Sequence, residues 1–124
     1  MVFGIGTDLI EVGRVERRLR EEAGFKEAVF TPREIAYCES KSGKARNYAA
    51  RFAAKEAFLK ATGMGWRGGL SFAQIEVVND ALGRPSLELS SEAKRFCETN
   101  AITAVHVSLS HIADFSSAVV VLER

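Results

Sequence analysis

The stretch from Lys44 to Ala61 constrains the fold more than any other part of the chain. It is followed by Thr62-Gly63, a typical helix end, and predicts one long helix over 44–61. At 100° per residue, one stripe of this helix contains mainly apolar side chains, namely Ala45, Tyr48, Ala49, Phe52, Glu56 and Leu59. We therefore expect this stripe, including its single glutamate, to face the core.

The remaining segments predict strands and helices that alternate in groups. Thr31-Pro32-Arg33-Glu34 has a Thr N-cap, a proline at the first helical position and a capping-box glutamate, so a helix is expected from there to about Ser40. The other expected helices cover 11–22 and 90–100, the latter capped by Ser90, and the expected strands cover 2–7, 72–78, 86–89, 104–110 and 116–122. This order predicts an α+β fold in which a mainly antiparallel sheet packs against helices, with the long helix at its centre.

Length and charge limit what such a chain does. It has 124 residues and a mass of 13.6 kDa, which predicts one domain covering 1–124. A domain of this size forms its own core without disulfides or metal. The chain has 17 Lys and Arg against 16 Asp and Glu, a net charge of +1, whereas nucleic-acid-binding modules normally carry a basic excess. We therefore expect no nucleic-acid partner.

The two cysteines, and the lack of a signal peptide or of an apolar run as long as a membrane helix, indicate a cytoplasmic location. Cys38 and Cys97 lie far apart, and with two histidines they do not form a structural zinc pattern. Met1 leads directly into a strand pattern without a basic signal-peptide region, and no apolar run approaches the roughly 20 residues of a membrane helix. We expect a cytoplasmic protein that does not contact the membrane.

Asp8 is the first candidate for chemistry. The two-residue period of a strand puts Gly4, Gly6 and Asp8 on one face, so a carboxylate lies beside backbone that has no side chains. This arrangement leaves room for a close approach. The alternative is that Asp8 only caps the helix that follows, because Asp8 and Glu11 have capping-box spacing.

Glu56 is the second candidate, and it also has two interpretations. A buried carboxylate needs a partner, and Lys60 one turn later supplies one in the favourable i,i+4 order. In that interpretation the two residues form an ordinary helical ion pair. A divalent cation is the other possible partner, because it would keep Glu56 ionised despite burial.

Two further segments carry polar or basic side chains on one side. His106, Ser108 and Ser110 share a strand face, with His111 next, and suit phosphate oxygens, although a half-solvated strand has the same pattern. Helix 11–22 carries Arg14, Arg17 and Arg18 among glutamates, which suits either an acidic partner or simple solvation. The glycines of 4–6 and 63–69 match neither a dinucleotide fingerprint nor a P-loop.

Five stretches in order along the chain resemble one family, the holo-[acyl-carrier-protein] synthases, the small bacterial type of 4'-phosphopantetheinyl transferase. Together they span nearly the whole chain, and the joint presence of the Asp8 motif and K-E-A-x-x-K makes the resemblance specific. The stretches are Gly4-Ile5-Gly6-Thr7-Asp8-Leu9-Ile10-Glu11, Phe30-Thr31-Pro32-Arg33-Glu34-Ile35-Ala36-Tyr37-Cys38, Arg51-Phe52-Ala53-Ala54-Lys55-Glu56-Ala57-Phe58-Leu59-Lys60-Ala61, Gly83-Arg84-Pro85, and His106-Val107-Ser108-Leu109-Ser110-His111.

The resemblance implies transfer of 4'-phosphopantetheine from coenzyme A to a serine of apo acyl carrier protein, with adenosine 3',5'-bisphosphate as the other product. It implies that Asp8 and Glu56 hold Mg²⁺, with Mn²⁺ as the alternative ion, in contact with the diphosphate. Lys60 is then placed to stabilise or protonate the leaving phosphate. The serine proton goes either to Glu56 or to a metal-bound water, and we favour the water.

The resemblance also implies binding residues and an assembly. Arg51 and His111 are expected at the nucleotide phosphates, Gly83-Arg84-Pro85 at the adenine, and Ser108 and Ser110 at the diphosphate. Arg14, with Arg17 or Arg18, is expected to steer the acidic carrier protein. The family further implies a homotrimer with each site between subunits, and a role in fatty acid biosynthesis.

Two other classes of function fit the residue patterns. One is a non-catalytic module that binds nucleotide or carrier protein, for which a metal pair beside Lys60 would be unnecessary. The other is a structural oligomerisation domain, in which Asp8 caps a helix and Glu56 pairs with Lys60.

Overall fold

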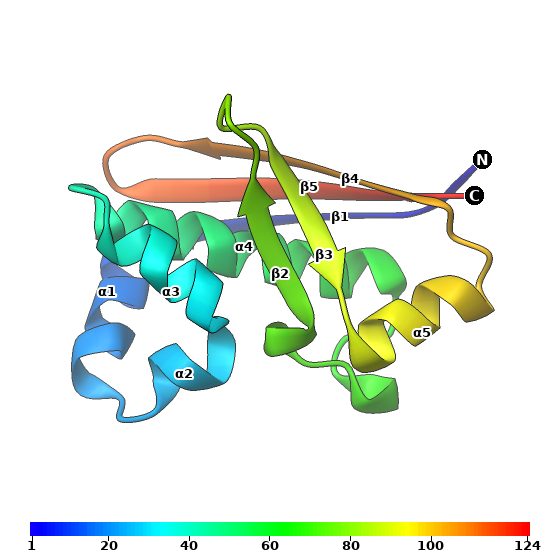
Figure 1. The fold of residues 1–124 in the computed structure, drawn as a ribbon, viewed down its shortest axis with the longest axis horizontal. Coiled ribbons are helices and arrows are strands. Elements are labelled where there is room, and N and C mark those ends of the chain that lie inside the picture. The colour runs from blue at the N-terminus through cyan, green and yellow to red at the C-terminus, as the bar shows by residue number, and fades with distance from the viewer.

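The computed structural model describes all residues from 1 to 124, and a long helix, α4, runs through its middle (Figure 1). A sheet of three long strands lies along one side of α4, and the shorter helices and a two-stranded hairpin lie along the other sides. In chain order the elements are β1 (Val2–Glu11), α1 (Val12–Glu21), α2 (Phe25–Val29), α3 (Pro32–Glu39), α4 (Lys44–Thr62), β2 (Ile75–Asn79), β3 (Pro85–Leu89), α5 (Ser91–Thr99), β4 (Ala104–His111) and β5 (Phe115–Glu123), with short 3₁₀ turns at Arg67–Gly69 and Phe72–Gln74.

The strands form two antiparallel sheets. The larger has the order β1-β5-β4, and the smaller pairs β2 with β3. The α+β class with antiparallel pairing around a long central helix is therefore confirmed, although the strands divide into two sheets. None of the helices is long and apolar enough to cross a membrane.

Only one face of the larger sheet is covered. The β5 side chains Ala118, Val120 and Leu122 are buried under α4. On the opposite face, Ile5 and Leu9 of β1 remain 65% and 69% exposed. In Figure 1 no element of the chain packs on this second face. Two large apolar side chains of β1 are therefore presented to the outside.

Helix α4 is buried on almost every side rather than along one stripe. Between Tyr48 and Thr62, every residue is buried except Glu56, which is half-buried, and Lys60, which is exposed. Tyr48, Ala49, Phe52 and Leu59 of the predicted stripe do face the core. The burial extends beyond that stripe because the sheet, α1–α3 and the β2–β3 hairpin enclose the helix together. Glu56 and Lys60 mark the one gap in this enclosure.

Most element boundaries follow the sequence prediction, and the differences have physical reasons. Strand β1 continues to Glu11 because β5 pairs with it over its whole length, and α2 was not predicted. Residues 72–74 form a 3₁₀ turn instead of strand. Ser90 stands at the N-cap of α5, but its side chain accepts no capping bond; Ala93 N–H bonds to the Gln74 side chain instead.

The predicted start of α3 is confirmed. The Thr31 hydroxyl accepts a hydrogen bond from Glu34 N–H at 3.2 Å, and Glu34 Oε1 accepts one from Thr31 N–H at 3.0 Å. Pro32 occupies the first helical turn. Glu34 is only 1% exposed, so this capping residue also extends into the interior.

Candidate active site

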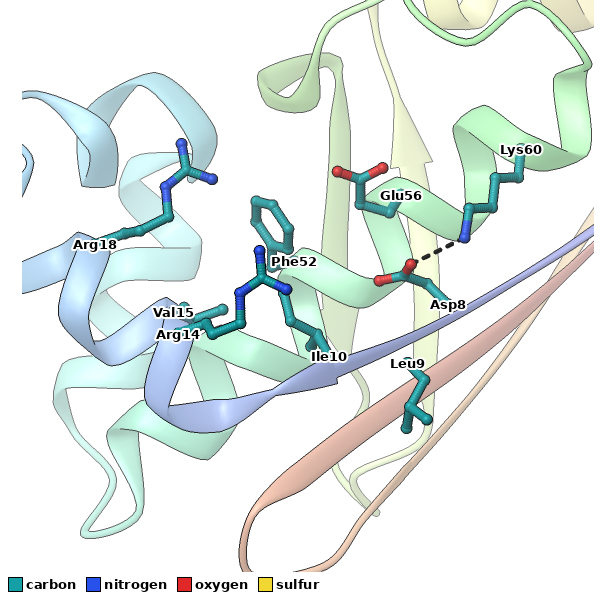
Figure 2. A pocket seen from close by; sticks show the side chains of 9 residues that line it. All are labelled: Asp8, Leu9, Ile10, Arg14, Val15, Arg18, Phe52, Glu56 and Lys60. Atoms are coloured by element: carbon teal, nitrogen blue, oxygen red, sulfur yellow. Dashed lines mark hydrogen bonds and ion pairs between the residues drawn. The ribbon is translucent and has the colours of Figure 1, made fainter.

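A cavity of about 320 Å³ lies where β1, α1 and α4 meet (Figure 2). It opens at the gap in the enclosure of α4, and both carboxylates singled out in the sequence line it. The lining residues are Asp8, Leu9, Ile10, Arg14, Val15, Arg18, Phe52, Glu56 and Lys60. The structure thus brings residues 8, 56 and 60 to one place.

Two glycines allow Asp8 to come so near to α4. A Cβ on Gly6 would lie 1.9 Å from the Ala57 carbonyl oxygen, and one on Gly4 would lie 2.0 Å from the Ala61 carbonyl oxygen. Real Cβ atoms do not approach so closely, so the strand backbone lies directly against the helix backbone because residues 4 and 6 have no side chain. Asp8, the next residue on that face, is carried to the side of Glu56.

Lys60 bonds to β1 and not to Glu56. Its ammonium group donates to Asp8 Oδ1 and to the Thr7 carbonyl oxygen, both at 3.0 Å. The N-cap residue of α1 is Glu11, and no side chain caps that helix. Both structural alternatives were therefore wrong: Asp8 does not cap α1, and Glu56 forms no ion pair with Lys60.

Glu56 lies in the cavity without a hydrogen bond to any neighbour drawn in Figure 2. Burial raises the pKa of Glu56, and the nearby negative charge of Asp8 raises it further, while Lys60 and Arg18 act in the opposite direction. Two carboxylates that repel each other in one cavity suit a hard divalent cation, because Mg²⁺ takes one or two protein carboxylates and fills its other positions with water and phosphate oxygens. The donor set thus fits Mg²⁺ or Mn²⁺, and it does not resemble a closed zinc site.

The three arginines of α1 have different surroundings. Arg14 and Arg18, one turn apart, both line the cavity, whereas Arg17 does not. The Arg18 guanidinium donates two bonds to Glu22, at 2.9 and 3.2 Å, and lies 4.2 Å from the centre of the Phe25 ring. Arg14 forms no salt bridge, so its charge is the more available of the two at the rim.

A second cavity, of about 470 Å³, lies between α4, the β2–β3 hairpin and the edge strand β4. It shares no lining residue with the first. Its charged lining residues are Arg51 and Arg84, with His111 beside them and no carboxylate, so it presents a basic surface suited to an anion. The lining includes the expected binding residues Arg51, Gly83, Arg84, Pro85, Ser108 and His111.

The family model of the 4'-phosphopantetheinyl transferase superfamily matches residues 4–120 of the sequence, and this range includes the residues of both cavities. The chain belongs to this superfamily. The resemblance noted from the motifs is therefore confirmed.

Relatives within the superfamily match along their full length. The chain is 48% identical over 126 residues to holo-[acyl-carrier-protein] synthase from Geobacter sp. strain M21, with all of both chains covered. It is 49% identical to the protein of the same name from Syntrophus aciditrophicus, over 99% of this chain and 97% of that one.

Solved structures show the same fold. The holo-[acyl-carrier-protein] synthase of Neisseria meningitidis superposes with a TM-score of 0.91 at 36% identity, with full coverage of both chains. A holo-(acyl-carrier-protein) synthase from Bacillus anthracis, solved in complex with coenzyme A (3',5'-ADP), superposes with a TM-score of 0.82 at 40% identity, over 99% of this chain and 97% of that one.

Ser110 is the one expected binding residue that is not among the lining residues of the basic cavity. It lines a neighbouring hollow with Leu9, Ile112 and Phe115, and His111 lines both that hollow and the basic cavity. His106, from the same strand face, bonds to Glu123 at 2.9 Å.

Sequence reasoning also missed residues of the superfamily fold that support the basic cavity. The Asn79 side chain contacts Arg51, and the Tyr37 ring lies 4.1 Å from the Arg51 guanidinium carbon. Asn79 lies between the expected strands 72–78 and 86–89, where the sequence assigned it no role. Lys55, the first lysine of K-E-A-x-x-K, is fully buried and donates to Glu34 at 2.7 Å. A lysine among apolar positions of a helix could have indicated a buried acidic partner.

Proposed function

We propose that this chain transfers the 4'-phosphopantetheine group from coenzyme A to a serine of apo acyl carrier protein. One observation carries the proposal: in a member of this superfamily, Asp8 and Glu56 meet in one cavity beside Lys60. The serine oxygen forms a bond to the phosphorus that bears pantetheine, and the diphosphate P–O bond breaks. The products are holo acyl carrier protein and adenosine 3',5'-bisphosphate.

Asp8 and Glu56 are the residues that would hold Mg²⁺, with Mn²⁺ as the alternative. Their mutual repulsion, which contributes to the raised pKa of Glu56, supports this role, because a cation relieves it. The ion, when bound, supplies positive charge that stabilises the diphosphate as negative charge develops on the leaving group.

Lys60 is proposed to stabilise or protonate the leaving phosphate. Its side chain is 55% exposed and lines the cavity, and its ammonium group bonds only to Thr7 and Asp8 of β1. A lysine in this position is near enough to the acid pair to reach a phosphate oxygen held there. Glu56 is the alternative acceptor of the serine proton within the chain itself, beside the water that we favour.

The basic cavity is proposed to bind the nucleotide part of coenzyme A. Arg51 and His111 would contact its phosphates, with Gly83-Arg84-Pro85 at the adenine and Ser108 toward the diphosphate. The absence of any carboxylate among the lining residues supports this assignment, since the nucleotide carries several negative charges. Arg14 and Arg18, at the rim of the other cavity, would meet the acidic carrier protein.

We further propose a homotrimer with each site formed between subunits. The acid pair and the basic cavity share no lining residue, which supports an arrangement in which a second chain brings its nucleotide-binding wall to the acids. The uncovered face of the larger sheet, with Ile5 and Leu9 exposed, supports association of copies through β1. Light scattering should give about three times 13.6 kDa, and Ile5→Lys should reduce it, whereas Leu82→Lys, at an exposed turn, should not.

We keep the cytoplasm as the proposed compartment and fatty acid biosynthesis as the proposed setting. Cys38 and Cys97 form no disulfide, which supports a reducing environment. We also propose that 1–124 is a single domain, since α4 contributes to both hydrophobic clusters of the core.

The decisive experiment is mass spectrometry of apo acyl carrier protein incubated with this chain, coenzyme A and Mg²⁺. We expect the carrier to gain the mass of one phosphopantetheine, and a chelator to prevent the gain. Binding of coenzyme A without any mass gain would instead support a non-catalytic binding module. No binding of coenzyme A at all would contradict both the transferase and the binding-module interpretations.

A further inference from the structure

Asn79, the last residue of β2, joins two parts of the basic cavity that come from different elements. Its Oδ1 accepts a hydrogen bond from Arg51 Nη2 of α4 at 2.7 Å. Its Nδ2 donates to the Gly83 carbonyl oxygen, in the turn between β2 and β3, at 2.9 Å. One amide group thus spans from the helix to the turn.

The turn is rigid within itself but needs an external attachment. Asp80 Oδ1 accepts bonds from Leu82 N–H and Arg84 N–H at 2.8 and 2.9 Å, and Gly83 adopts a φ of 86° that side chains disfavour. These contacts set the shape of residues 80–84. None of these contacts reaches α4, whereas Asn79 links the turn to Arg51 of that helix.

Arg51 also depends on its neighbours for its direction. The residue is 3% exposed, its Nε–H has no hydrogen-bond partner, and Glu34 Oε2 is 4.0 Å away, beyond hydrogen-bond distance. The Tyr37 ring covers one side of the guanidinium. The hydrogen bond from Nη2 to Asn79 is therefore the contact that holds the end of this buried cation at the cavity.

We propose that Asn79 is a positioning residue that prepares the basic cavity for an anionic nucleotide, by orienting Arg51 and by fixing the Gly83-Arg84-Pro85 turn against α4. The inference rests on the proposed function, in which the nucleotide is that of coenzyme A. Asn79 acts through Arg51 and the turn and not by contact with the reacting atoms. Its loss should weaken ground-state binding and leave the chemical step unchanged.

The test compares four proteins: wild type, Asn79→Ala, Arg51→Met and the double variant. In calorimetric titrations with coenzyme A, we expect Asn79→Ala to weaken binding about tenfold, the effect of losing a hydrogen bond to a charged group. The KM for coenzyme A should rise by a similar factor, with kcat within about twofold of wild type. Because the two residues act together, the double variant should lose much less than the product of the single losses.

Controls separate positioning from folding. Asn100→Ala removes a similar amide, which bonds only to the Phe96 carbonyl oxygen of α5, and should leave coenzyme A binding unchanged. Asn79→Thr retains strand propensity but is too short to span both partners, so it should reproduce the loss even if Asn79→Ala unfolds.

Three outcomes would overturn the inference. They are wild-type affinity in Asn79→Ala or Asn79→Thr, a fall in kcat without a rise in KM, or losses that multiply in the double variant. If wild type itself does not bind coenzyme A, the proposed function fails and the inference fails with it; binding by wild type and by the Asn79 variants alike overturns the inference alone.

Discussion

Glu34 of α3 and Glu56 of α4 lie in opposite environments. Glu34 is 1% exposed, and its carboxylate accepts bonds from Thr31 N–H, Lys55 Nζ and Val77 N–H at 3.0, 2.7 and 2.9 Å. Glu56 is half-buried beside another acid and receives no bond from its cavity neighbours. One carboxylate is satisfied by the chain, and the other is left for a partner from outside.

The difference shows how the same residue type serves structure in one place and chemistry in another. Burying a charge is costly unless hydrogen bonds and an opposite charge compensate for it. Burial lowers the pKa of Lys55, while the charge of Glu34 and the hydrogen bond to it act to raise that pKa. Glu56 has only partial compensation, and its raised pKa marks a site that a cation would complete.

The largest expected effect is that of Glu56→Gln. We expect transfer to slow by about 10³-fold, because a neutral side chain cannot compensate a divalent cation. The folded protein should melt at a higher temperature without cation near neutral pH. The pKa of Glu56 is raised by folding, so its contribution to stability is present at acid pH and is lost as pH rises through that raised pKa.

Rates of carrier modification and thermal melts with a chelator present check both parts. Normal transfer by Glu56→Gln would contradict the role of Glu56 in cation binding. A lower melting temperature at neutral pH would contradict the electrostatic comparison with Glu34.

Glu34→Gln should lower the stability of the fold, whereas Glu56→Gln should raise it near neutral pH. It leaves Lys55 buried without a counter-charge, which costs about 3–5 kcal/mol of unfolding free energy. Combining it with Lys55→Met removes the unpaired charge and should recover much of that loss. Urea unfolding measures both variants, and a loss below about 1 kcal/mol in Glu34→Gln would show that the buried pair matters little.

Gly6→Ala tests how the two acids are brought together. The added Cβ must push β1 away from α4, which should cost about 1–3 kcal/mol and separate Asp8 from Glu56. Mn²⁺ titration of the protein alone should show weaker binding. Gly13→Ala is the matched control, since its Cβ meets nothing within 4 Å and should change stability by less than about 1 kcal/mol. Unaltered Mn²⁺ affinity in Gly6→Ala would argue against this close packing as the basis of the site.

Arg14→Glu tests the exposed cations near Glu56. We expect the KM for acyl carrier protein to rise about tenfold at low salt, with coenzyme A affinity unchanged, because rim charges steer association. Arg20→Glu, on the same helix but away from the cavity, is the control for charge reversal. Equal effects of both variants would show that only net charge matters.

The smallest expected effect concerns a third carboxylate, Glu39, which is exposed yet satisfied. Bonds from Tyr48 Oη, Lys26 and Lys44 hold the pKa of Glu39 at about 2, below its ordinary 4.5. Its stabilising contribution is therefore present above about pH 4.5 and is lost as pH falls toward about 2. The difference in unfolding free energy between wild type and Glu39→Gln, below about 1 kcal/mol, should fall to zero over that pH range in thermal melts. A gap that widened in acid would contradict the assignment.

Local patterns were predictable, whereas partners distant in sequence were not. The start of α3 depends on Thr31 and Glu34, three residues apart, and it was predicted with the correct bonds. The face shared by Gly4, Gly6 and Asp8 follows from strand geometry. For Lys60, local spacing offered only Glu56, one helical turn before it, as a possible partner; the partner in the structure, Asp8, is 52 positions away. Asn79 is 28 positions from Arg51, and no local pattern links the two.

The sequence by itself determined the order of helices and strands, the resemblance to one superfamily and the residue types of the acid pair. Local hydrogen bonding and side-chain periodicity depend only on neighbours along the chain. Which carboxylate is buried and neutralised and which is left open was decided only by the tertiary structure. Burial around α4 results from the larger sheet, α1–α3 and the β2–β3 hairpin packing together, and the gap at Glu56 and Lys60 lies where none of these groups covers the helix.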